Sequence, residues 1–186
     1  MDYITNIQQF LPANEQEVTD QGVMLSFIHQ HEDNVLFRDN LIAHITSSGF
    51  LMNKNLDQVL LIHHNIRNAW AWTGGHADGD NDLLHVAIKK AAEETGAMAI
   101  SPLSDKIASL DILPVSGHWR KGVFVNAHLH LSVAYVLIGD EQEEIRPQLS
   151  ENTDVAWFSV DYFSDAYFDA TDVYLYNKLI AKAQSF

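Results

Sequence analysis

The stretch from Gly74 to Ala97, which reads GGHADGDNDLLHVAIKKAAEETGA, restricts the possible folds more than any other part of the chain. Its first half is a glycine-rich acidic loop, and its second half predicts a helix from about Asp82 to Thr95. Asn81 or Asp82 is suited to cap the start of this helix, and Gly96 is suited to end it. Apolar residues recur at the spacing of a helix face that packs on a core: Leu84, Ala87, Ile88 and Ala91. The chain therefore places an acidic loop directly before a core-packing helix.

Strand patterns lie on both sides of this helix. From Ala43 onward the sequence alternates with a period of two, which predicts a hairpin of His44–Met52 with Val59–His64 around a turn at 53–57. After the helix, further strands are predicted at Ile107–Val115, Val123–Ile138 and Asp154–Val160, and a C-terminal helix at Thr171–Gln184. The Val123–Ile138 stretch is long enough for two strands or one bent strand. This order predicts an α/β fold with a mixed sheet covered by helices on both faces.

The N-terminal part has a different character. Residues 2–40 read as helical, with Asn14 and Glu17 spaced as a capping box just after Pro12. We therefore predict two units, namely residues 1–40 as a helical extension packed on the main domain and residues 41–186 as the main domain itself. An apolar helix at either end of the chain can pack within the chain or across a homodimer, and the sequence leaves both arrangements open.

Composition and charge narrow the possible functions. The chain has no cysteine, which excludes a disulfide framework, a thiolate zinc site and a cysteine nucleophile, and suits a reducing cytoplasm. It shows no signal-peptide pattern and no apolar run near the roughly 18 residues of a membrane span, so we expect a cytoplasmic protein without a membrane partner. The net charge of -14 disfavours binding to nucleic acid polymers. Either this acidity aids solubility alone, or a divalent cation offsets it where a phosphate-bearing substrate binds.

The end of the predicted helix carries the first candidate site. Lys90, Glu93 and Glu94 are neighbours at i+3 and i+4 and lie on a different face from the apolar stripe. Two adjacent carboxylates on a rigid helix can hold a hard cation such as Mg²⁺. The alternative is a solvent-exposed helix face on which Lys89 pairs with Glu93 and Lys90 pairs with Glu94. The spacing alone is compatible with both interpretations.

Histidine and tryptophan side chains form a second group of candidates. His128 and His130 alternate on a predicted strand and therefore point to one face. Together with carboxylates they can hold a transition metal, or they can donate hydrogen bonds to a substrate phosphate. His76 directly follows the two glycines, and Trp72 and Trp70 precede them. Either tryptophan can stack on a base or cap a pocket, although packing in the core or at a hairpin edge explains them better.

The segment from Gly75 to Ala97 resembles the Nudix box, G-x5-E-x7-R-E-U-x-E-E-x-G-U, where U is a bulky apolar residue. Glu93 and Glu94 match its paired glutamates, and Gly96 matches its second glycine. The runs HITSSGF, LLIHH, WAWTGGH and HLH are similar to a bacterial Nudix subgroup, so that the resemblance covers most of residues 40–160.

This resemblance implies a Nudix-type α/β/α sandwich and hydrolysis of a small-molecule diphosphate linked to another moiety, such as a nucleoside diphosphate. It also implies that Glu93 and Glu94 are the catalytic residues and hold Mg²⁺ or Mn²⁺. The residues expected to contact the substrate surround the two glycines or lie on the later histidine strand: Trp72, Gly74, Gly75, His76, His128 and His130.

Three positions depart from the box. Asn81 stands where the first glutamate belongs, Lys89 replaces the arginine, and Lys90 replaces the glutamate that follows it. An ammonium group cannot ligate a cation and repels it. Two functions therefore remain open. One is a metal-dependent hydrolase that takes its general base from Glu151 or the Glu141–Glu144 run, and the other is a catalytically impaired module that binds a nucleotide-like ligand, with Lys90 in place of the metal. The isoprenoid diphosphate isomerase branch of the superfamily needs a cysteine and is excluded.

Overall fold

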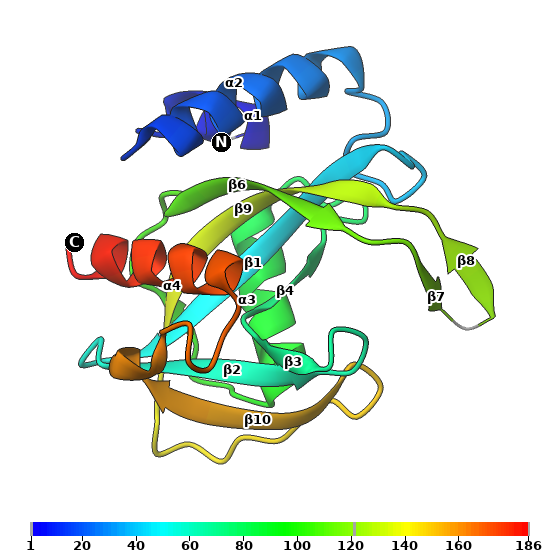
Figure 1. The fold of residues 1–186 in the computed structure, drawn as a ribbon. Helices are drawn as coiled ribbons and strands as arrows, with labels where there is room; N and C mark the ends of the chain where they lie inside the picture. The colour runs from blue at the N-terminus through cyan, green and yellow to red at the C-terminus, as the bar shows by residue number, and fades with distance from the viewer. Residues whose placement is uncertain (1, 121, 186) are drawn as a thin grey trace.

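The computed structural model describes residues 2–120 and 122–185. Its centre is a mixed sheet in which β1 (Ala43–Asn53) pairs in parallel with β9 (His128–Gly139) and antiparallel with β2 (Gln58–His64). Five further strands join these three: β3 (Ala69–Ala71) and β10 (Asn152–Ser159) pair with β2, β4 (Thr73–His76) pairs with β1, and β5 (Ser101–Pro102) and β6 (Ser109–Val115) pair with β9. The predicted mixed sheet is thereby confirmed (Figure 1).

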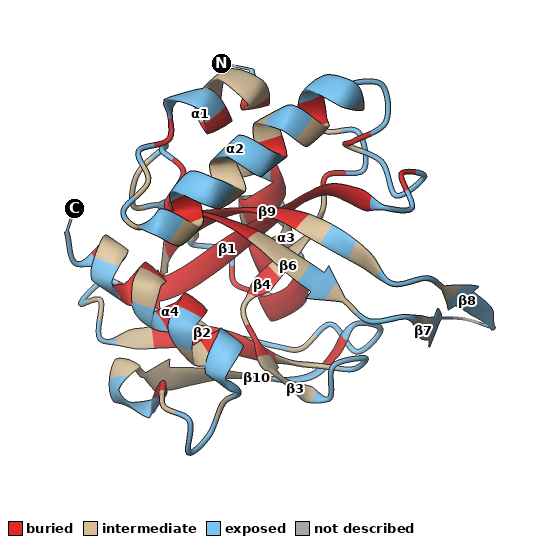
Figure 2. Cartoon of the chain, turned by 45° about the horizontal axis from the view of Figure 1, so that its top comes forward, coloured by how far each residue is buried: buried red, intermediate tan, exposed pale blue. Residues whose placement is uncertain are grey.

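Helices cover both faces of this sheet, as predicted. The helix α3 (Leu83–Thr95) packs on one face, and α4 (Ala170–Ala183) packs on the other (Figure 1). Side chains of β1 point alternately to the two faces of the sheet and so contribute to both hydrophobic cores. Ile45 and Leu51 lie in the core between the sheet and α3, whereas Phe50 and Met52 lie in the core between the sheet and α4. Every residue of β1 is buried (Figure 2).

Two helices precede the sheet, α1 (Tyr3–Gln9) and α2 (Glu15–Gln30). Asn14 caps α2 by accepting a hydrogen bond from the Glu17 amide at 2.9 Å. The carboxylate of Glu17 is almost fully buried and lies 3.2 Å from Lys178 of α4, and Lys178 also contacts Asp111 of β6 at 2.6 Å. This buried ion cluster joins α2 to the sheet edge and to the C-terminal helix.

The predicted helix over residues 2–40 is wrong in its last part, because α2 ends at Gln30 and turns follow as far as β1. The side chain of Asn40 accepts from the amides of Ile42 and Ala43 and donates to the side chain of Asn34 at 3.0 Å. Asparagine side chains compete in this way with helical backbone hydrogen bonds.

Most other boundaries agree with the sequence prediction. Asp82 caps α3 by accepting from the His85 amide at 3.0 Å, and Gly96 ends the helix at a φ of 72°. The stretch 123–138 divides into two strands, β8 (Val123–Val125) and β9. β8 pairs with β7 (His118–Arg120) in a separate ribbon that projects from the body of the molecule (Figure 1). A short 3-10 helix, η1 (Val160–Tyr162), follows β10. Among the described residues, no helix has the length and apolarity to cross a membrane.

Candidate functional site

The end of α3 places Glu94 against β4. Glu94 is only 3% exposed, because it follows Ala87 and Ala91 along the buried face of the helix. Its Oε2 accepts a hydrogen bond from the Gly74 amide at 3.2 Å. The prediction that Glu94 shares an outer face with Lys90 and Glu93 is therefore wrong, since Glu94 lies on the core side of α3.

Burial and neighbouring charges determine the protonation of Glu94. Burial is the main cause that raises the pKa of its carboxyl group to about 8, and repulsion from Glu151 and Glu93 acts in the same direction. The hydrogen bond from Gly74 and the charge of Lys90 only partly offset these effects. At neutral pH the protein alone therefore holds Glu94 mainly in its protonated form.

Lys90 and Glu93 form an ion pair beside this buried carboxyl group. The Lys90 Nζ lies 2.8 Å from the Glu93 Oε2, so that the pairing is i, i+3. The aliphatic part of Lys90 covers Gly75, where an added Cβ would lie 2.9 Å from the Lys90 Cδ. At Gly74 an added Cβ would lie 2.9 Å from the Ser48 Cα. Gly74 is therefore required for the close approach of β4 to the backbone of β1, whereas at Gly75 only the flexible Lys90 side chain would have to shift.

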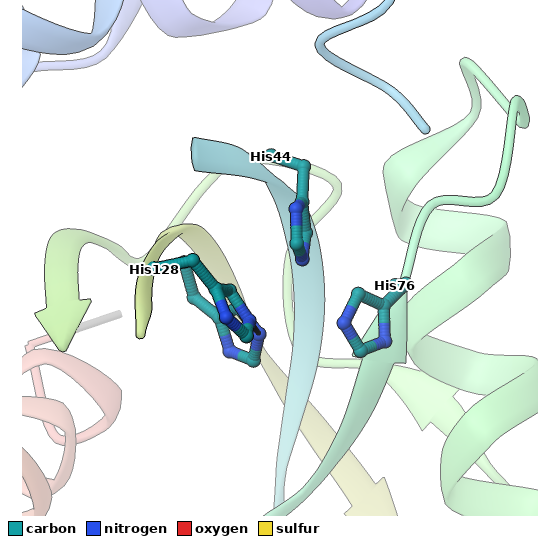
Figure 3. A group of neighbouring side chains, drawn as sticks. His44, His76 and His128 are labelled. Carbon is teal, nitrogen blue, oxygen red and sulfur yellow. Dashed lines mark hydrogen bonds between the residues drawn. The ribbon is translucent and has the colours of Figure 1, made fainter. Parts of the chain in front are cut away.

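The three histidines predicted as substrate ligands lie elsewhere. Gly75 faces α3, so the next residue, His76, faces the opposite side of β4. There His76 meets His128, His130 and a further histidine, His44 of β1 (Figure 3). One ligand atom from each of the four rings lies within 4.8 Å of the others. We call these four residues the histidine cluster.

Sequence reasoning missed His44 because its partners are distant along the chain. The parallel pairing of β1 with β9 places His44 opposite His130, and the pairing of β1 with β4 places Thr46 opposite His76. The sequence showed only that His44 lies on a predicted strand whose side chains alternate between two faces. Only the order and direction of β1, β4 and β9 in the sheet show that His44 lies beside the other three histidines.

Hydrogen bonds fix the orientation of two rings in the histidine cluster. The Nδ1 of His44 lies 3.0 Å from the Asn40 carbonyl oxygen, and the Nδ1 of His128 lies 2.9 Å from that of Asn126. A carbonyl oxygen only accepts, so both Nδ1 atoms donate, and in a neutral ring the Nε2 atom then carries a lone pair. The Nε2 of His44 has no hydrogen-bond partner among the described residues, whereas that of His128 lies 3.3 Å from the His130 Nε2. Burial lowers the pKa of His44 and lowers that of His130 to about 3, which favours neutral rings.

The remaining candidates have structural contacts. Trp70 packs edge-on against Phe158 with 4.8 Å between ring centroids, and the Trp72 amide donates to the Tyr176 hydroxyl at 3.3 Å. Both tryptophans pack against the core beneath α4, so a role of Trp72 in substrate binding stays a prediction. Glu143 accepts from the Met98 and Ala99 amides at 2.9 and 3.1 Å, and Glu141 accepts from Asn53. Glu151 is exposed and affects the pKa of both Glu94 and Lys90.

The chain matches a known protein family and resembles the fold of solved structures. The family profile described as NUDIX domain matches residues 43–179. A hydrolase of the NUDIX family from Clostridium perfringens superposes with a TM-score of 0.52 at 20% identity, covering 74% of this chain and 96% of that one. A C. elegans Ap4A hydrolase in a binary complex gives 0.52 at 13% identity, covering 76% and 98%. No curated protein matches the sequence.

Proposed function

Because this chain belongs to the NUDIX family, we propose that it hydrolyses a phosphoanhydride bond in a small-molecule diphosphate linked to another moiety, such as a nucleoside diphosphate. The reaction site is the end of α3 with Gly74, Gly75 and Glu151, which we call the box site. The observation that carries the proposal is that three side chains meet beside two glycines. The buried Glu94 accepts from the Gly74 amide, and Lys90 lies against Gly75 and pairs with the exposed Glu93. The same residues fall within the stretch matched by the family profile.

The donor chemistry of the box site fits a hard divalent cation. Glu93 and Glu94 offer carboxylate oxygens, which Mg²⁺ and Mn²⁺ prefer as ligands. Burial and the charges of Glu151 and Glu93 raise the pKa of Glu94, and a cation beside it would oppose these effects by favouring the carboxylate. We therefore propose Glu93 and Glu94 as the metal ligands. The bound cation would neutralise charge on the diphosphate and acidify a water molecule.

The protein's own groups then have separate tasks. We propose that Glu151 is the general base that accepts a proton from the attacking water, because it is exposed and close enough to perturb Glu94 and Lys90. Glu141 and Glu143 are less suitable, since both hold backbone or side-chain amides of neighbouring segments. Lys90 can attract the diphosphate, although it also competes with a cation for Glu93.

One observation favours a second function, that of a module which binds a nucleotide-like ligand without cleaving it. The Lys90 ammonium lies 2.8 Å from Glu93, where it already supplies the positive charge that a cation would bring. With a neutral Glu94 beside it, the box site needs no metal to balance its charges. In that case the ligand's phosphates would contact Lys90 directly.

Two measurements separate these functions: calorimetric titration with Mg²⁺ or Mn²⁺, and phosphate release from a panel of nucleoside diphosphate compounds. The hydrolase proposal requires cation-dependent release by the wild-type protein and faster release by Lys90→Glu, because the substitution adds a carboxylate where an ammonium opposes the metal. Lys89→Glu is the matched control, since it makes the same charge change at an exposed position one residue away. Ligand binding without release or cation uptake in all three proteins would favour the binding module.

A further inference from the structure

The histidine cluster brings four imidazoles from three strands to one face of the sheet. Its members come from the start of β1, the end of β4 and the start of β9, and the strand registers that align them are part of the fold. Ring centroids of neighbouring members are 4.8 to 5.3 Å apart. We propose that His44, His76, His128 and His130 form a binding site for a transition-metal ion, with Zn²⁺ as its preferred occupant.

The spacing of the ligand atoms suits a small tetrahedral ion. Zn²⁺ binds histidine nitrogen at about 2.0–2.1 Å, which places two tetrahedral ligands about 3.3 Å apart. The Nε2 atoms of His128 and His130 are 3.3 Å apart, so one edge of such a tetrahedron is already formed. The ligand atoms of all four residues lie within 4.8 Å, and side-chain rotation of a half-buried ring such as His76 can close the remaining distance.

One ring nitrogen of the histidine cluster has no hydrogen-bond partner in the described part of the chain. His44 is 4% exposed, and its Nε2 is buried without a hydrogen-bond partner. A buried polar atom without a partner is costly, and a metal bond removes that cost. The Nδ1 atoms of His44 and His128 donate to backbone carbonyls, as the second ring nitrogen of a metal-bound histidine commonly does.

The same hydrogen bonds argue against a phosphate as the ligand of this site. Phosphate oxygens accept hydrogen bonds, and so do the Nε2 atoms of His44 and His128 when the rings are neutral and their Nδ1 atoms donate. Only rings protonated on both nitrogens could donate to a phosphate from these Nε2 atoms. Neutral nitrogen donors select Zn²⁺, Cu²⁺ or Ni²⁺ over Mg²⁺.

Four protein ligands leave a tetrahedral ion no open position, which is the pattern of a structural zinc site. A metal here would connect β1, β4 and β9 where the strands begin or end, beyond the part of the sheet that α4 covers. The inference does not depend on the proposed function, because the box site uses other residues on the opposite side of β4.

The test uses the full chain, freed of metal by dialysis against a chelator, with Zn²⁺ and Co²⁺ as probes. We expect one ion per chain, competition of Zn²⁺ with Co²⁺, and the intense visible absorption of tetrahedral cobalt, even in excess Mg²⁺. His128→Ala should weaken Zn²⁺ binding about 100-fold or more, because loss of a ligand costs at least as much as loss of a supporting contact. His29→Ala is the matched control, since His29 is an exposed histidine on α2 outside the cluster.

Each alternative outcome is decisive. Failure of the wild-type chain to bind Zn²⁺, or an octahedral cobalt spectrum, would overturn the proposal. Equal Zn²⁺ affinity in the wild type and in His128→Ala would do the same. If circular dichroism shows that His128→Ala is unfolded, His130→Gln replaces it and must show the same loss. Binding of inorganic phosphate by the metal-free protein that His128→Ala abolishes would assign the cluster to an anion instead.

Discussion

The box site and the histidine cluster have similar burial but opposite chemistry. Each contains one nearly buried side chain, Glu94 at 3% exposure and His44 at 4% exposure, and each lies beside β4. At the box site, carboxyl groups are crowded together and Lys90 supplies a countercharge. At the histidine cluster, four imidazole rings face one another, and the Nε2 of His44 has no hydrogen-bond partner among the described residues. The comparison indicates that the fold presents oxygen donors at one site and nitrogen donors at the other. Substitutions and metal ions that affect one site should therefore leave the other unchanged.

The largest expected effect is on hydrolysis. Glu94→Gln should lower phosphate release by about 1,000-fold, within the range expected for loss of a group acting directly in catalysis and equivalent to about 4 kcal/mol. Glutamine keeps the shape of the protonated acid and an acceptor for the Gly74 amide, but it cannot become a carboxylate ligand. Steady-state kinetics with the best substrate of the panel measures the change. Zn²⁺ binding should stay at the wild-type value, and a parallel loss of both would show that the two sites are not independent.

Metal removal should affect stability through the histidine cluster. Zn²⁺ at 100 times its dissociation constant should raise the free energy of unfolding by about 2.7 kcal/mol, because it binds the folded chain preferentially. Urea unfolding with and without Zn²⁺ measures this difference. His76→Ala should lose most of the stabilisation, whereas Glu93→Gln should retain it. Equal stabilisation of the His76→Ala protein would place the ion outside the cluster.

A substitution in β1, the strand that carries His44 and packs on α3, should lower the stability of the fold. At Gly49 an added Cβ would lie 2.5 Å from the Leu137 side chain and 3.3 Å from the Ala87 carbonyl oxygen. Gly49→Ala should therefore lower the free energy of unfolding by about 2 kcal/mol through overpacking between β1 and α3. Chemical denaturation is the measurement, and Gly22→Ala on α2 is the control, because nothing lies within 4 Å of its added Cβ. A larger loss in the control would contradict the packing argument.

The smallest expected effect is that of the ion pair on stability. Lys90→Met should change the free energy of unfolding by only about 0.5 kcal/mol, since partly exposed pairs contribute little and methionine keeps part of the packing on Gly75. The same substitution should strengthen Mg²⁺ or Mn²⁺ binding at the box site, as calorimetry can measure. Unchanged cation affinity would mean that Lys90 does not compete with the metal.

Local signals made much of the fold predictable. Asp82 and Gly96 set the limits of α3 through short-range capping, which a sequence displays directly. The period-two pattern located β1 and β2 for the same reason. Residues 31–42 were harder, because the polar side chains that end α2 and form turns also occur on exposed helix faces.

The candidate sites were only partly predictable. The burial of Glu94 has a readable cause in its spacing from Ala87 and Ala91, although the neighbouring Glu93 suggested a shared outer face. His44 had no local signal, since its place beside His130 depends on β1 and β9, which pair in parallel although they lie far apart in the sequence. Side chains that meet through sheet topology are beyond what periodicity can reveal.

The alternation of β1 has a consequence for how this protein can change over evolutionary time. Ser47 and Gly49 face α3 next to the box site, whereas His44 faces the histidine cluster. Inserting or deleting one residue within β1 would exchange these faces and disrupt both sites in a single event. The turn at 54–57, which contributes to neither site, is free of this restriction, whereas the turns at 31–42 include Asn40, whose carbonyl oxygen orients His44. We therefore expect homologous chains to vary in length at 54–57 and to keep the eleven residues of β1 intact.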